Sequence, residues 1–141
     1  MNDFDFKCYD IDEKEIIIPP GLPQSVIARL VEICNVKFDV REDELYNVKY
    51  PVLIGKEKDL EEAKKYLQLI TEAKLALRDI ARLARKYNIK AKVYAEDENL
   101  RYILNELKND IANRNFIEIV EEKPEDSEVV NVADKKIYVG V

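Results

Sequence analysis

The stretch KEKDLEEAKKYLQLITEAKLALRDIARLARKYNI, residues 56–89, decides the fold because it predicts one long helix. Asp59 and Glu62 have the Asp-x-x-Glu spacing of a helix cap, and Asn88 before Ile89 is typical of a left-handed helix stop. The apolar positions form a band wider than a coiled-coil seam, so we expect the helix to pack against other elements over much of its length. They are Tyr66, Leu69, Ile70, Ala73, Ala76, Leu77, Ile80, Leu83, Ala84 and Tyr87.

The second half of this stretch also carries basic residues at intervals of four. Residues spaced by four share one face of a helix, so Lys74, Arg78, Arg82 and Lys86 form a row of roughly 18 Å. A row of this length can follow several phosphates of a nucleic-acid backbone. We therefore predict a nucleic-acid-binding face made of Lys74, Arg78, Arg82, Arg85, Lys86, Lys90 and Lys92.

The basic row also has an explanation that needs no ligand. Acids begin the helix and bases end it, which complements the helix macrodipole, and lysine and arginine are good helix formers on a solvent-facing surface. Tyr87, Tyr94 and Tyr102 would offer stacking surface for bases near the row, but they fit equally well as core or sheet residues. Both interpretations stay open at the level of the sequence.

Charge is distributed unevenly along a chain that is acidic as a whole. The 141 residues have a net charge of -6, which argues against a generic nucleic-acid coat or a membrane-surface binder. Residues 74–92 hold seven lysines and arginines against one acid, whereas residues 93–134 hold twelve acids against four bases. This asymmetry would orient a polyanion, pair two lobes of one chain, or bring two copies together.

The residues needed for common catalytic sites are missing. The chain has no histidine and no glycine-rich phosphate loop, so we expect no enzyme activity, no cofactor and no metal site. The Glu-x-Lys arrangement at Glu121 and Lys123 would suit a metal-dependent nuclease, but the nearest upstream aspartate, Asp110, falls within a predicted helix. Acidic residues cluster at residues 10–13, 42–44 and 96–98, and we interpret these clusters as solvated turns and helix starts.

Other compositional features concern the cellular setting. Cys8 and Cys34 are far apart and form no CxxC motif, so we interpret them as reduced core residues of a cytoplasmic protein. No targeting signal and no membrane-spanning run is evident. The composition, rich in lysine, glutamate and isoleucine, favours a thermophilic source.

The remaining segments predict an α+β fold with mainly antiparallel sheet, one long central amphipathic helix and two shorter helices. A period-two pattern at Phe4, Phe6 and Cys8 indicates a first strand, and Pro51 places the strand over residues 46–54 at a sheet edge. We expect an N-terminal lobe (1–56), a connecting helix (57–88) and a C-terminal lobe (89–141), or one compact domain. The other predicted strands cover residues 15–18, 36–40, 90–95, 116–120, 129–132 and 137–139. The first of the shorter helices covers residues 23–35. The second is capped by Asp97, and its apolar stripe is Leu100, Ile103, Leu104, Leu107 and Ile111.

Residues 57–141 resemble the C-terminal end of valyl- and isoleucyl-tRNA synthetases, where the last anticodon-binding helix precedes a small α/β unit. The likeness rests on ALRDIAR (76–82), YNIKAKVY (87–94), ENLR (98–101), FIEIV (116–120) and IYV (137–139). It implies tRNA contact through the basic helix end, but not aminoacylation, because the catalytic signatures of those enzymes need histidines. Residues 15–43, with EIIIPPGL (15–22) and KFDVRED (37–43), are similar to the small N-terminal domain of repair-type superfamily 2 helicases.

Taken together, these features predict a non-catalytic accessory module that binds nucleic acid, with RNA as one candidate, through the basic helix face. The alternative is a protein–protein interaction subunit or adaptor that uses the same charged face and self-associates. A protein partner in a larger complex is expected in either case, and no membrane is.

Overall fold

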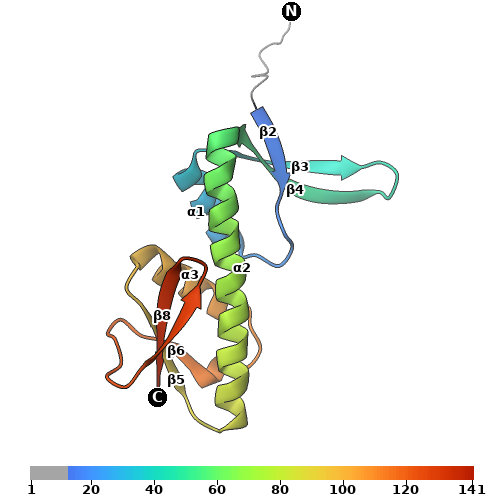
Figure 1. Ribbon diagram of the computed structural model, residues 1–141. Helices are drawn as coiled ribbons and strands as arrows, with labels where there is room; N and C mark the ends of the chain where they lie inside the picture. Colours follow the sequence, from blue (N-terminus) through green and yellow to red (C-terminus); the bar gives the residue numbers. More distant parts are fainter. Residues whose placement is uncertain (1–12) are drawn as a thin grey trace, which may run out of the picture. The chain divides into compact units, whose positions relative to one another are not determined.

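The long helix α2 (Glu57–Lys86) is unbroken over 30 residues, as predicted. The computed structural model describes residues 13–141, and the strand predicted around Phe4, Phe6 and Cys8 lies outside them. The chain divides into two compact units, one of residues up to Gly21 with Ile27–Leu67, the other of Leu22–Val26 with Gln68–Val141. Over the described residues the fold class is α+β, with three α-helices and sheets rich in antiparallel pairs (Figure 1).

The first unit holds a three-stranded antiparallel sheet. Strands β2 (Glu13–Ile17), β3 (Lys37–Asp43) and β4 (Val48–Lys56) lie in the order β2-β4-β3, and helix α1 (Gln24–Cys34) connects β2 to β3. The core of this unit is apolar and fully enclosed at Leu30, Val52 and Leu53. Gly55 lies close to Val36, just before β3, since an added Cβ would be 3.1 Å from Val36 Cγ1, which would have to move by a few tenths of an ångström.

Strand β4 is the central strand, so the prediction that Pro51 marks an edge was wrong. Pro51 lies opposite Val40 of β3, and its carbonyl oxygen accepts the Ile18 N–H at 3.0 Å on the side of β2. The missing N–H of proline therefore faces the point where β2 ends, at Ile17. A central strand tolerates proline here because no ladder bond is needed beyond the last residue of its neighbour.

The second unit holds a four-stranded mixed sheet in the order β6-β5-β8-β7. Strands β5 and β6 run parallel, joined through helix α3, which lies against both, whereas the β5–β8 and β7–β8 pairs are antiparallel. A short 3₁₀ helix, η1 (Arg114–Phe116), precedes β6. The bounds of the other elements are β5 (Ala91–Ala95), α3 (Glu98–Lys108), β6 (Ile117–Ile119), β7 (Glu128–Val132) and β8 (Lys135–Gly140).

Helix α3 forms as its sequence predicts. The carboxylate of Asp97 accepts the Leu100 N–H at 3.0 Å, which satisfies one of the unpaired donors at the helix start. The apolar residues of the predicted stripe are all buried, Leu100, Ile103, Leu104 and Leu107 on the helix and Ile111 after it. The helix ends at Lys108, so the prediction that it includes Asp110 and Ile111 was wrong.

The two ends of α2 differ in how well the sequence predicts them. The start is not the predicted Asp59–Glu62 cap, because β4 passes directly into the helix at Glu57, whose carboxylate pairs with Lys14 of β2 at 2.5 Å. The predicted left-handed stop is confirmed. Asn88 has a φ of 54°, its N–H donates to Arg85, and the Ile89 N–H donates to Ala84 at 2.9 Å.

The buried face of α2 is narrower than predicted. Leu83 and Tyr87, expected in the apolar band, are 45% and 64% exposed, whereas Ala81 is fully buried. Leu83 lies two residues, about 200° of rotation, from Ala81, and therefore points away from the buried face. The other buried members of the band are Tyr66, Leu69, Ile70, Ala73, Leu77 and Ala84.

Candidate nucleic-acid interface

The basic row of α2 lies on the flank of the helix next to its buried face. Lys74, Arg78, Arg82 and Arg85 each follow a buried residue, and one residue is a rotation of about 100°. These side chains therefore emerge beside the core-facing side of the helix. The buried residues that precede them are Ala73, Leu77, Ala81 and Ala84.

Most of the row is open to solvent. Arg78, Arg82, Arg85 and Lys86 are exposed, and Lys74 is half-buried. Arg82 lies 3.5 Å from the carboxylate of Asp79 one turn earlier, with both side chains about two-thirds exposed at 65% and 70%. An ion pair this exposed contributes little to stability, so Arg82 can exchange Asp79 for another anion at small cost.

Two weak contacts orient the end of the row. The Arg85 guanidinium donates to the Asn113 side-chain oxygen at 3.2 Å, and the Lys86 ammonium lies 5.6 Å from the centroid of the Tyr87 ring. Both are interactions with neutral groups, so neither neutralises the positive charge. The end of α2 therefore presents cations that have partners but keep their full charge.

Lys90 and Lys92 differ from the helical cations. Lys90 is exposed directly after the left-handed stop and continues the positive end of α2. Lys92 lies on β5, opposite Glu118 of β6, and lines an open pocket with Glu122, Glu125 and Asp126 of the loop before β7. Lys92 thus lies near four acids and one further base, Lys123, and of the seven predicted residues it is the one that the fold places beside several acids.

Of the three tyrosines considered for stacking, Tyr87 is the most open. Tyr94 packs against Tyr138 across the β5–β8 pair, with ring centroids 6.1 Å apart, and the Arg101 guanidinium lies 5.2 Å from the Tyr94 centroid. Arg101 is held there by two hydrogen bonds to the Ala95 carbonyl. The Tyr94 ring is therefore already covered in part. Tyr102 is half-buried as well.

An exposed apolar row, which the sequence analysis assigned in part to the core, runs beside the basic row. Leu75, Leu83 and Tyr87 are exposed by 51%, 45% and 64%, at positions spaced by four or eight. Asp79 fills the remaining position of this row. The period of four was visible in the sequence, but the width of the apolar band concealed that these residues point outward.

Within residues 13–141 no group of three or more metal-ligating side chains comes together. Lys123, considered for a nuclease site, lies 4.4 Å from the Tyr138 ring centroid. Cys34 is a free, buried thiol, and its pKa is raised by burial, then by Glu62 and Asp59. In the same part of the chain, no helix combines the length and apolar character that crossing a bilayer requires.

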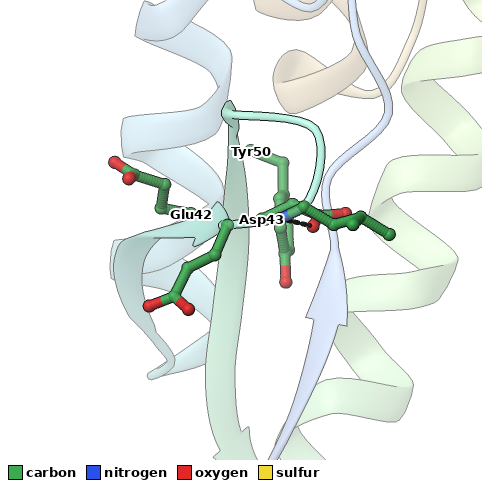
Figure 2. A pocket seen from close by; sticks show the side chains of 5 residues that line it. Glu42, Asp43 and Tyr50 are labelled. Atoms are coloured by element: carbon green, nitrogen blue, oxygen red, sulfur yellow. Dashed lines mark hydrogen bonds between the residues drawn. The ribbon is translucent and has the colours of Figure 1, made fainter.

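A second surface feature lies at the far end of the β3–β4 hairpin, at one of the acidic clusters that were interpreted from the sequence as solvated turns (Figure 2). An open depression there is lined by three consecutive acids, Glu42 to Glu44, together with Leu45 and Tyr50. The Asp43 carboxylate accepts the Leu45 N–H at 3.0 Å, which shapes the turn. Leu45 and its neighbour Tyr46 are 81% and 72% exposed, so the tip of the hairpin is both acidic and apolar.

The fold and the cationic helix flank define a small α+β protein with an exposed basic surface. The chain belongs to the family described as "Uncharacterized protein MJ0093 family", whose model matches residues 13–139. A relative, "Uncharacterized protein MJ0093" of Methanocaldococcus jannaschii, is 76% identical over 142 residues, with all of both chains covered. No solved structure matches the chain.

Proposed function

We propose that this protein is a non-catalytic accessory module that binds nucleic acid, with RNA as the favoured ligand, through the cationic flank of α2. The observation that carries the proposal is the exposure of Arg78, Arg82, Arg85 and Lys86 on one continuous stretch of helix. Arginine and lysine side chains contact phosphates in known complexes, and such contacts fix the register of the protein without reading sequence. Lys74 and Lys90 flank the contact surface, and Lys92 lies at its margin.

The exposed ring of Tyr87 favours a single-stranded ligand. Its side chain lies next to Lys86 at the end of the row. A cation beside an open aromatic face is the combination that single-strand binders use, with the phosphate on the cation and a base on the ring. Stacking on one ring is worth roughly 1–3 kcal/mol per base, so Tyr87→Ala should weaken binding to single strands more than binding to duplex.

Titration of a fluorescently labelled tRNA and a labelled single-stranded RNA, each at two salt concentrations, tests the proposal. Phosphate contacts release counterions, so the affinity should fall steeply as salt rises. The double variant Arg78→Glu/Arg82→Glu should abolish binding. Absence of binding by the unmodified protein at low salt would remove the proposal.

A matched control lies on the same helix. Lys64 and Lys65 are exposed in the first half of α2, and Lys64→Glu/Lys65→Glu changes the net charge by the same amount. If binding depends on the local flank, this variant keeps most of its affinity. If binding depends only on net charge, both variants lose affinity equally. Circular dichroism of both variants shows whether the helix is retained.

The second candidate function is that of a protein-interaction subunit or adaptor using the same face. The exposed row of Leu75, Leu83 and Tyr87 beside the cations favours it, because apolar side chains gain little from a phosphate backbone. An acidic protein partner would use both rows. Leu75→Ser/Leu83→Ser should then abolish the interaction, whereas nucleic-acid binding should tolerate the change.

A further inference from the structure

We propose that the outer edge of β3 pairs with the β3 edge of a second copy of this chain, which joins two three-stranded sheets into one of six strands. In the sheet order β2-β4-β3, no described strand lies on the outer side of β3. Its seven residues, Lys37–Asp43, form an edge long enough for pairing. This inference goes beyond nucleic-acid binding and uses different residues.

The backbone groups of the edge point outward at alternate residues. The Val40 N–H donates to the carboxylate of its own neighbour Asp39 at 2.8 Å, and not to β4. The carbonyl of Pro51, opposite Val40, is also turned away from β3, because it accepts from Ile18 on the other side. With a period of two, Phe38, Val40 and Glu42 therefore present their N–H and C=O groups to the open side.

The charge sequence of β3 fits an antiparallel copy of itself in one register. In a pair with its two-fold axis at Val40, Lys37 faces Asp43 of the second copy, and Asp39 faces Arg41. By symmetry this places four pairs of opposite charge across the junction. Opposite charges directly across two strands stabilise the pair, by roughly 0.2–1 kcal/mol each, and like charges destabilise it.

Neighbouring registers that keep the same faces together are disfavoured by the same charges. An axis at Asp39 would set Asp39 against itself and Lys37 against Arg41. An axis at Arg41 would set Arg41 against itself and Asp39 against Asp43. Charges on an edge strand usually prevent pairing. Here they prevent the shifted registers and favour the one that also uses all seven residues.

Apolar residues near the edge are exposed at positions that suit this register. Phe38 and Val40 are about half exposed, at 47% and 49%, on one face of the sheet. Continued past the strand, the register brings the hairpin tip, with Leu45 and Tyr46, level with the turn after α1 of the second copy. Ile33 at the end of α1 is 55% exposed. In this register Val40 lies beside Val40 of the second copy on the same face of the joined sheet.

The existing ion pairs of β3 do not oppose the pairing. Arg41 lies 2.9 Å from Glu15 and 2.8 Å from Asp39, and Lys37 lies 3.3 Å from Glu13. The side chains in these pairs range from one-quarter exposed, at Glu13, to nearly three-quarters exposed, at Lys37, and ion pairs with this much access to water contribute little. The carboxylates and cations keep further hydrogen-bonding positions for a residue across the new junction.

Disulfide trapping tests the register directly. In a Cys8→Ser/Cys34→Ala background, Val40→Cys places two thiols opposite each other across the axis, with Cα atoms about 5.5 Å apart, within disulfide range. The matched control Glu42→Cys lies on the same face but would be about 14 Å from its copy. Mild oxidation should link the Val40→Cys variant and not the Glu42→Cys variant. Equal linking of both, or linking of neither, would overturn the proposal.

Light scattering on the full chain provides the second measurement. The unmodified protein should show a dimer that dissociates on dilution. Val40→Pro should be a monomer with an unchanged circular dichroism spectrum, because the N–H it removes is not used by β4. Lys37→Glu should weaken the dimer, and Lys37→Glu/Asp43→Lys should restore it. A monomeric unmodified protein overturns the proposal. This holds even if a variant that lacks residues 1–12 forms a dimer.

Discussion

Asp97 and Lys135 are joined by an ion pair of 2.9 Å that ties the start of α3 to the first residue of β8. The same carboxylate caps α3 through the Leu100 N–H. The Asp97 side chain therefore both caps α3 and holds the β7–β8 hairpin against the start of that helix. The two groups influence each other's ionisation, since the pKa of Asp97 is lowered chiefly by Lys135 and the pKa of Lys135 is raised by Asp97.

Removal of the Asp97 carboxylate should destabilise the fold more than removal of its charge. Asp97→Ala loses the helix cap and the ion pair, and we expect a loss of about 1–2 kcal/mol in the free energy of unfolding. Asp97→Asn keeps a capping oxygen and should lose less than half of that. Guanidinium unfolding of both variants gives the comparison, and equal losses would show that the cap contributes nothing.

The same pair predicts the direction of a pH dependence. The pKa of Asp97 is lower in the folded state, so its contribution is complete above the unfolded pKa of about 3.9 and is lost as the pH falls through the folded value. The pKa of Lys135 is raised, so its contribution is lost only at alkaline pH, above about 10.4. The stability difference between the unmodified protein and Asp97→Asn should shrink below pH 4. A difference that stays constant to pH 2 contradicts the assignment.

Two leucines of α2, six residues apart, should respond very differently to truncation. Leu77 is fully buried, and Leu77→Ala should cost about 2–5 kcal/mol. Leu83 is 45% exposed, and Leu83→Ala should change the free energy of unfolding by less than about 1 kcal/mol. Thermal or chemical unfolding of the two variants measures this. Similar losses would mean that Leu83 is covered in solution.

The turn between β7 and β8 should be improved by glycine. Ala133 has a φ of 55°, a left-handed conformation that costs an alanine roughly 1 kcal/mol. Ala133→Gly should therefore leave stability unchanged or raise it by a few tenths of a kcal/mol, in spite of the greater flexibility of the unfolded chain. Ala133→Val should destabilise the protein clearly. The melting temperatures of the two variants give the test.

The contact beneath that turn can be tested separately. The Ala133 N–H donates at 2.8 Å to the carboxylate of Glu72 on α2, which also accepts from Gln68. Glu72→Ala leaves a partly buried donor without this partner and should cost about 1–3 kcal/mol. Glu72→Gln keeps an acceptor at the same place and should be milder. A smaller loss of stability for Glu72→Ala than for Glu72→Gln would indicate that water replaces the carboxylate.

The sequence predicted features that depend on neighbouring residues along the chain. The stripe of α3 and its Asp97 cap, and the Asn88 stop of α2, follow from spacing and from local hydrogen bonding. The place of Pro51 did not follow, because whether a strand is central depends on which distant segments pair with it. Leu83 was assigned to the core because helical periodicity identifies a band but not which of its margins the neighbouring elements cover.

The candidate surfaces also combine features that local sequence predicts with features that depend on distant segments. The period of four in the basic row was visible in the sequence, and its exposure needed the structure. The acidic neighbourhood of Lys92 arises from a loop some thirty residues later, which spacing cannot reveal. The alternating charges of β3 were present in KFDVRED as well. They acquired a meaning only once β3 was found at an edge and Val40 was found to direct its N–H outward.

The direct passage from β4 into α2 sets the rotational phase of the helix. Lys56 ends the strand and Glu57 begins the helix, with no residue between them to absorb a change. A single inserted residue at this junction would turn every following side chain by about 100° about the helix axis. Leu60 and Ala63, now enclosed, would swing towards water, so this joint should tolerate substitution far better than any change in length.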